Sequence, residues 1–418
     1  MSRWFAWLGG VRLVLVQWVV LLAAGLVSIL PRRDDWIGSW KLALDGSAGA
    51  TVFIGPVAAG LACLVYSRLR SSGVGEIIAQ GRRDWWSWSQ PAVGLWALAS
   101  TALLCVAVGA TTASSLAGVP AYPRLLWILI PALAVLGSQV AIGAAIGWAS
   151  GRPWAAPLTA VMLFLLYLWT VVGPLPEFFD SGSATSSLAG FDVVPGPWLA
   201  LGVAAVALTV VVLAAAHRRL FLASWPRRAV VGAALCGWLV SWFTVGDSSD
   251  RYAPVADPAF TCAGAQPEVC VLAETTRPLA DLARRVDRGA RALRDVGAPL
   301  PDRFTEQWGL EPSSDGVVIL DDYSSSEVPQ QLVIDTLVRP ARCAPDYEQG
   351  PPEEVWAARR LLGRWLEVET GRSVPAAQDH WHDWLTGPPA PREAWVRTTY
   401  AQLADCAYDQ VRMPGAAR

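Results

Sequence analysis

The chain has 418 residues, of which 53% are hydrophobic and only 16% are charged, and its mean hydropathy is +0.36. This composition excludes a protein made only of ordinary soluble domains and favours a membrane protein. The net charge of −2 combines two unlike parts. Residues 1–245 carry 15 Lys and Arg against 8 Asp and Glu, whereas residues 246–418 carry 18 against 27. A basic membrane part joined to an acidic soluble part explains the difference, and neither has the charge pattern of a nucleic-acid-binding protein.

Seven apolar segments in the first part are each close to the ~20 residues that a helix needs to cross the hydrocarbon core. None of them contains Asp, Glu, Lys, Arg or His, and tryptophans gather near their ends, as at a membrane interface. We interpret the first segment as a retained anchor, because it is too long for a signal peptide and lacks a good A-x-A site. The predicted spans are 13–30, 49–66, 91–112, 125–148, 154–173, 197–216 and 229–245.

The basic residues predict the orientation of these spans, since Lys and Arg near short loops resist translocation. With the N-terminus inside, eleven fall on the cytoplasmic side and four outside. Seven crossings then place everything after Gly246 outside the membrane. The inside set is Arg3, Arg12, Arg68, Arg70, Arg82, Arg83, Arg152, Arg218, Arg219, Arg227 and Arg228, and the outside set is Arg32, Arg33, Lys41 and Arg124.

The inside loop 67–90 is the most distinctive cytoplasmic feature. Val74, Ile77 and Ile78 would share one face of a short helix, and charged residues flank it. One interpretation is an amphipathic interfacial helix. The functional alternative is a docking surface for a cytoplasmic ATPase, formed by Glu76, Ile77, Ile78, Arg82, Arg83 and Asp84.

The spans themselves offer no intramembrane charge of the kind that marks ion paths in coupled transporters. They are rich in small residues, and Gly143 and Gly147 form a G-x-x-x-G pair, for which we expect ordinary packing within the bundle. No P-loop occurs, so any dependence on ATP would come from a partner.

Four of the seven cysteines follow the last span, an even number in what would be an oxidising compartment. Two disulfides are therefore expected among Cys262, Cys270, Cys343 and Cys406. Of the three pairings, we favour Cys262 with Cys270 and Cys343 with Cys406. A zinc site is the rival interpretation, but the spacing lacks a C-x-x-C pair.

The outer part is predicted to be a mixed α and β domain in which helix predominates. Strands are expected at 267–274 and 316–322, and helices at 277–297, 328–338, 351–371 and about 392–412, the last carrying Cys406. The helix at 277–297 has an apolar stripe that consists of Leu279, Leu282, Val286, Leu293 and Val296.

Catalytic motifs are not evident in this domain. Asp379, His380, His382 and Asp383 form the only histidine cluster, but two histidines two residues apart do not share a helical face. We therefore expect an exposed turn rather than a metal site. No H-E-x-x-H or G-x-S-x-G motif occurs, and the acidic loop at 314–327 has no nearby histidine. The sequence thus predicts no enzyme, metal or cofactor.

The basic N-terminal segment 1–12, the loop 67–90 and the first six spans together resemble permeases of the type-2 class of ABC transporters. The resemblance covers residues 1–216. It implies a six-helix fold, usually dimerised, that moves substrate outward with a separate ATP-binding subunit, and it implies a coupling helix within 74–84. The span 229–245 and the outer domain depart from that pattern.

The expected fold is thus a polytopic helical bundle, N-terminus inside and C-terminus outside, with a disulfide-bonded extracellular domain. We divide it into 1–216, a permease-like domain; 217–245, a cytoplasmic loop and seventh span; and 246–418, the extracellular domain. The leading function is a subunit of an ABC exporter in the plasma membrane, as a homodimer or heterodimer. The alternatives are a membrane-anchored extracellular sensor or binding protein and, third, a membrane-bound hydrolase.

Overall fold

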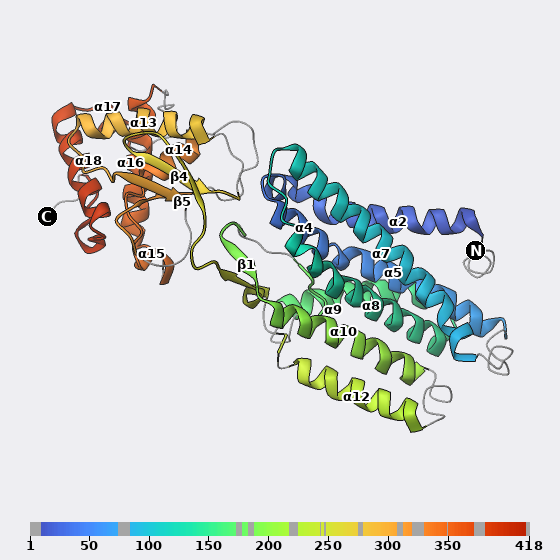
Figure 1. The fold of residues 1–418 in the computed structure, drawn as a ribbon. Helices are drawn as coiled ribbons and strands as arrows, with labels where there is room; N and C mark the ends of the chain where they lie inside the picture. The colour runs from blue at the N-terminus through green and yellow to red at the C-terminus, as the bar shows by residue number, and fades with distance from the viewer. Residues whose placement is uncertain are drawn as a thin grey trace. The chain divides into compact units, whose positions relative to one another are not determined.

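The structure is a computed structural model, and the chain divides into two compact units, Met1–Ala253 and Pro254–Arg418 (Figure 1). The boundary falls a few residues after the position 246 at which the composition changes. The residues that the structure describes are 10–73, 84–172, 178–182, 188–216, 225–242, 244–245, 248–274, 279–306, 312–319, 330–348, 350–371 and 381–414.

The first unit is built almost entirely of helices that run side by side (Figure 1). The main helices are α2 (Val11–Ile29), α4 (Trp40–Gly49), α5 (Thr51–Ser71), α7 (Asp84–Leu116), α8 (Leu129–Ser150), α9 (Ala155–Val172), α10 (Pro195–Ala216) and α12 (Trp225–Trp242). The shorter elements are η1 (Leu30–Arg32), α3 (Arg33–Trp36), η2 (Pro123–Ile128), β1 (Phe191–Val193), η3 (Ser248–Arg251) and β2 (Tyr252–Pro254), and β1 pairs with β2.

Five helical stretches among the described residues are long and apolar enough to cross a membrane. They are Val11–Arg32, Trp40–Ser71, Trp88–Leu116, Pro123–Ser150 and Pro195–Ala216. The fifth and seventh predicted spans form shorter apolar helices, Ala155–Thr170 and Arg228–Ser241. The protein is therefore a helical membrane protein, while the count of seven crossings stays a prediction.

Helices α5 and α8 lie against each other at the centre of the bundle because small residues let their backbones approach. An added Cβ on Gly143 would lie 2.1 Å from the carbonyl oxygen of Ala59, and one on Gly147 would lie 2.3 Å from that of Cys63. No side chain fits at either position. The G-x-x-x-G pair thus serves packing within the bundle, as expected.

The segment before the second span differs from the expectation. We predicted residues 31–48 to be an outside loop, but they form α3 and α4, and α4 is almost wholly buried. Lys41 and Asp45, which lie on α4, are 3% and 1% exposed. The bundle therefore contains buried charge at one end, although the predicted spans themselves carry none. Contacts made by α4, described below, explain how this charge is tolerated.

The second unit contains a four-stranded sheet in the order β3-β4-β5-β6. Its strands are β3 (Phe260–Ala263), β4 (Glu268–Leu272), β5 (Arg303–Glu306) and β6 (Gly316–Val318). The first pair is antiparallel and the other two pairs are parallel. Strands β4 and β6 match the strands predicted at 267–274 and 316–322, whereas β3 and β5 were not predicted.

Helices of the second unit pack on this sheet and on one another. They are α13 (Leu279–Asp295), α14 (Gln330–Leu337), α15 (Pro345–Glu348), α16 (Glu353–Glu369), α17 (His382–Thr386) and α18 (Pro389–Ala404), with a short η5 (Tyr408–Gln410). The predicted stripe of α13 is confirmed: Leu282, Val286 and Leu293 are buried in the core, and Leu279 and Val296 pack against it. The unit therefore has a hydrophobic core of its own.

Two disulfides join Cys262 to Cys270 and Cys343 to Cys406, which are the favoured pairings. The first links residues directly opposite each other on β3 and β4. The last helix was predicted to carry Cys406, and this is wrong. Helix α18 ends at Ala404, because Cys406 adopts a left-handed backbone with φ of 55° that cannot continue a helix.

Candidate functional site at one end of the helix bundle

Helix α4 carries two charged side chains into the interior of the first unit. The hydroxyl of Ser39 accepts a hydrogen bond from the backbone N–H of Leu42 at 3.3 Å, so it caps the start of the helix. Lys41 and Asp45 follow one turn apart and therefore share one face of α4. Burying both is costly unless each finds a partner.

Lys41 finds its partners in two distant segments. Its ammonium donates a 2.5 Å hydrogen bond to the carbonyl oxygen of Phe191, at the start of β1. The same nitrogen lies 4.5 Å from the centre of the Tyr122 ring, a cation–π contact. The only lysine of the chain is thus held between the connection before η2 and the connection before α10.

Asp45 accepts a 2.5 Å hydrogen bond from the hydroxyl of Tyr252, a residue 207 positions later in the chain. Burial and then the nearby negative charge of Asp45 raise the pKa of Tyr252 well above its ordinary value. The tyrosine therefore stays protonated and keeps donating at neutral pH. This bond ties α4 to β2, at the very end of the first unit.

A second acid and base meet beside this pair. Arg251 donates a 2.8 Å hydrogen bond to the backbone carbonyl of Asp180, and its guanidinium lies 3.9 Å from the carboxylate of the same residue. Arg251 is 1% exposed, and its guanidinium lies 5.4 Å from the centre of the Trp198 ring. The charges therefore compensate each other inside the fold.

The segment Phe178–Gly182 enters the bundle beside α4. The hydroxyls of Thr51 and Ser181 lie 2.6 Å apart, and the Ser181 hydroxyl donates to the carbonyl of Ala48 at 2.7 Å. Gly182 lies so close to α4 that an added Cβ would be 2.1 Å from the carbonyl oxygen of Asp45. A glycine is required there because the neighbour is backbone.

We call Lys41, Asp45, Asp180, Arg251 and Tyr252 the polar cluster. Its members come from three parts of the chain, before α5, before α10 and after α12, and Tyr122 from a fourth, before α8, contacts Lys41. Charged groups buried in a helical membrane unit are functional candidates by default. The geometry allows this cluster to hold the chain that leads into the second unit against α4.

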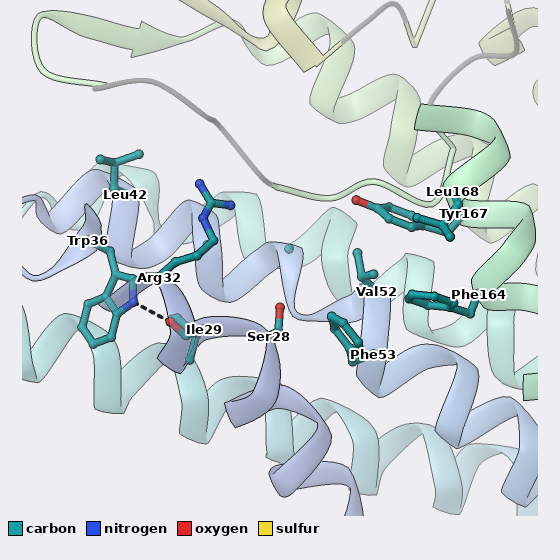
Figure 2. A pocket seen from close by; sticks show the side chains of 12 residues that line it. Ser28, Ile29, Arg32, Trp36, Leu42, Val52, Phe53, Phe164, Tyr167 and Leu168 are labelled. Atoms are coloured by element: carbon teal, nitrogen blue, oxygen red, sulfur yellow. Dashed lines mark hydrogen bonds between the residues drawn. The ribbon is translucent and has the colours of Figure 1, made fainter. Parts of the chain in front are cut away.

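A cavity of about 270 Å³ lies on the neighbouring face of α4 (Figure 2). Helix α4 contributes Leu42, Gly46 and Gly49 to the lining. Leu42 and Gly46 directly follow Lys41 and Asp45 in the sequence and so lie on the adjacent face of the helix. Figure 2 shows Arg32 and Ser28 on the side of α2, and Phe53, Phe164 and Tyr167 across from them. Helices α2, α4, α5 and α9 thus enclose a mostly apolar space.

The opposite end of the bundle is closed by other contacts. Arg70, in the last turn of α5, donates to the backbone carbonyls of Trp148 and Ala149 at the end of α8. The Tyr66 hydroxyl donates to the carbonyl of Trp88 on α7 at 2.6 Å. These bonds hold the end of α5 and the start of α7, between which the predicted docking loop lies.

Most of the predicted docking residues lie outside the described residues: these are Glu76, Ile77, Ile78, Arg82 and Arg83. Asp84 is the first residue of α7. The cysteines are placed in the two disulfides given above. In the histidine cluster, His382 and Asp383 begin α17, while Asp379 and His380 lie outside the described residues.

Within the described ranges, the single group of metal-capable side chains is Cys262, Glu268 and Cys270. Its two cysteines are joined in a disulfide, so their sulfurs do not act as thiolate ligands.

Sequence reasoning missed the polar cluster, although a signal was present. The only lysine stands four residues before an aspartate in an otherwise apolar stretch, WKLALDGSAG. Two opposite charges at this spacing share a helical face. A helix assigned to 40–49 would have identified them as a pair that needs buried partners.

The family comparison concerns the second unit. Residues 269–406 match a family model described as a domain of unknown function (DUF7224). The matched range begins in β4, ends at Cys406 and covers about a third of the chain. Comparison with curated proteins gave no match, and comparison with solved structures gave none.

Proposed function

We propose that the chain is the permease-like, membrane-spanning subunit of an ABC exporter and works with a separate ATP-binding subunit. The observation that carries the proposal is the bundle in which α2, α5, α7, α8, α9 and α10 pack on one another. A helix of 21 residues such as α5 is about 31 Å long. Ser71, the last residue of α5, therefore lies far from the polar cluster, and the proposed docking loop follows it in the sequence.

The orientation is part of the proposal: seven crossings in the plasma membrane, with the N-terminus inside and the second unit outside. In this orientation all four connections that meet at the polar cluster lie on the outer side. Arg70 joins the ends of α5 and α8, which this orientation assigns to the inner side. The two disulfides support the outer placement of the second unit, since they persist in oxidising compartments.

Affinity purification from native membranes tests the proposal. The tagged chain should bring down a protein with a P-loop, and the double substitution Ile77→Asp and Ile78→Asp should abolish that recovery. Arg152→Asp, which changes another connection on the inner side, is the control and should leave recovery unchanged. If the wild-type chain repeatedly recovers no P-loop protein, the proposal is wrong.

A second function, a membrane-anchored binding protein, is favoured by one feature of the second unit. A groove of about 290 Å³ runs between α14 and α16, and more basic than acidic residues line it. They are Arg339, Arg359, Arg360 and Arg364 against Asp335 and Glu367, beside the exposed Trp356. The full chain should then bind an extracellular anion, and Arg360→Glu with Arg364→Glu should weaken that binding without affecting recovery of the P-loop protein. The two functions are therefore separable in one set of variants.

A further inference from the structure

The disulfide between Cys262 and Cys270 fastens an edge strand of the second unit to its sheet. Strand β3 stands at the end of the order β3-β4-β5-β6, and among the described strands it pairs only with β4. The two cysteines lie directly opposite each other in this pair. The strand begins at Phe260, a few residues after the second unit starts at Pro254. The disulfide therefore fixes the chain close to the point where it enters the second unit.

The two disulfides differ in their access to solvent. Of the four cysteines that form them, only Cys262 is exposed. Cys343 is 0% exposed and belongs to the hydrophobic core of the second unit, against which Cys406 packs. A thiolate that reduces a disulfide must reach one of its sulfurs, so exposed disulfides exchange with thiols and buried ones resist them. Attack on the folded chain is therefore directed to the sulfur of Cys262.

Other contacts hold the β3–β4 hairpin when its disulfide is open. Arg294 of α13 donates a 3.1 Å hydrogen bond to the carbonyl of Gln266, in the turn between the two strands. On the neighbouring strand β5, Arg303 pairs with the Glu268 carboxylate at 2.9 Å. The disulfide spans a separation of only 8 residues, whereas the second disulfide spans 63 and restricts the unfolded chain more. Opening the first disulfide therefore leaves the second unit folded.

We infer that the Cys262–Cys270 disulfide is a redox switch that an external dithiol opens, and that its opening loosens β3 while the rest of the second unit stays folded. One thiolate of the dithiol attacks the sulfur of Cys262, which forms a mixed disulfide and releases Cys270 as a thiolate. The second thiolate of the dithiol then closes a disulfide within the reductant and releases Cys262. Two electrons and two protons thus pass from the dithiol to the two cysteines. This inference does not depend on transport or on an ATP-binding partner.

Glu268 is placed to control the rate of this exchange. Its carboxylate and the sulfurs of Cys262 and Cys270 all lie within 4.8 Å of one another. Negative charge develops on the sulfurs during the attack and on the leaving group, and a neighbouring carboxylate opposes it. Arg303, the ion-pair partner of Glu268, favours the same charge. Glu268→Gln should therefore speed reduction about threefold, and Arg303→Gln should slow it by a similar factor.

Timed reduction of the purified full chain with dithiothreitol tests the inference, with alkylation of the new thiols and peptide mass spectrometry. In the absence of denaturant, Cys262 and Cys270 should be labelled about tenfold faster than Cys343 and Cys406, or more. Hydrogen exchange of the partly reduced chain should increase in β3 and stay unchanged in α16. Oxidised dithiothreitol should restore the slow exchange of β3. The double substitution Cys262→Ser and Cys270→Ser should reproduce the exchange pattern of the reduced chain.

Glu353→Gln is the matched control for Glu268→Gln, because it removes an exposed acid at the start of α16, far from either cysteine in the sequence. It should be reduced at the rate of the wild type. Equal rates of reduction for the two disulfides would overturn the inference. So would reduction of Cys262–Cys270 only in denaturant, or reduction that leaves the hydrogen exchange of β3 unchanged. Exchange that increases throughout the second unit would also overturn it, because the disulfide would then hold the whole fold together.

Discussion

At the scale of single residues, every charge of the polar cluster is compensated by a group from another segment. Asp45 depends on Tyr252, and Arg251 on Asp180. A buried ion that loses its partner keeps the cost of desolvation without the compensating attraction. The stability of this end of the bundle should therefore respond to conservative substitutions that remove a single donor.

Tyr252→Phe removes only the hydroxyl that donates to Asp45. We expect the first unit to lose about 1–3 kcal/mol of stability, because a buried acceptor is left without its donor. Thermal unfolding of the full chain in detergent, followed over pH, measures this loss. The pKa of Tyr252 is raised in the folded state, so its contribution is present at neutral pH and is lost as the pH rises above the ordinary value of 10.0.

The difference in stability between the wild type and Tyr252→Phe should therefore stay constant at neutral pH and become smaller above about pH 10. Asp192→Asn, which changes an exposed acid in β1, serves as the control. A difference that grows at alkaline pH would contradict the assignment of Tyr252 as a neutral donor.

The second unit contains a comparable pair. The guanidinium of Arg359 donates to both carboxylate oxygens of Asp346, at 3.2 and 3.0 Å, and also contacts the Tyr408 hydroxyl at 2.5 Å. Arg359 is 4% exposed. Asp346→Ala should destabilise this unit by about 3–5 kcal/mol, because it leaves a buried cation unpaired.

Replacing both partners, as in Asp346→Leu with Arg359→Met, should destabilise the unit much less than Asp346→Ala does. Pulse proteolysis of the full chain in urea reports the unfolding of this unit. Additive effects of Asp346→Leu and Arg359→Met, with no coupling between them, would show that the pair contributes nothing as a pair.

At the scale of elements, the close contact of α5 with α8 sets the shape of the bundle. Gly143→Ala should destabilise the protein by about 1–3 kcal/mol or more, because its Cβ would meet the backbone of Ala59 and no flexible side chain can move away. Gly109→Ala on α7 is the matched control, since its Cβ would meet no atom within 4 Å.

Gly109→Ala should be neutral or slightly stabilising, because alanine favours a helix by roughly 1 kcal/mol over glycine. Melting temperatures and the monodisperse fraction in size-exclusion chromatography distinguish the two variants. If Gly143→Ala is as stable as Gly109→Ala, then α5 and α8 do not pack through these glycines.

At the scale of the whole molecule, the proposed orientation is open to a direct labelling test. Ser72 lies at the end of α5 and Ser115 in the last turn of α7, and both are exposed. In a chain whose free cysteines Cys63, Cys105 and Cys236 are replaced by alanine, Ser115→Cys should react with a membrane-impermeant maleimide in intact cells. Ser72→Cys should react only after the membrane is permeabilised, and the reverse pattern would invert the topology.

Much of the architecture could be predicted from local patterns. The lengths of the apolar segments identified the helices of the first unit. The helical spacing of Leu282, Val286 and Leu293 identified α13. Each of these patterns lies within one segment, so it can be recognised without knowledge of the fold. The end of the last helix could not be predicted in this way, because the left-handed backbone of Cys406 accompanies a disulfide to a residue 63 positions earlier.

The sequence by itself determined that this is a helical membrane protein with a separate cysteine-paired unit, since hydropathy, charge and cysteine number are properties of the chain. Only the tertiary structure decided that Lys41 and Asp45 are buried and what compensates them. Their partners, Phe191 and Tyr252, lie 150 and 207 residues away. The cavity beside Arg32 depends on four helices in the same way, because a cavity exists only where side chains from distant segments fail to fill space.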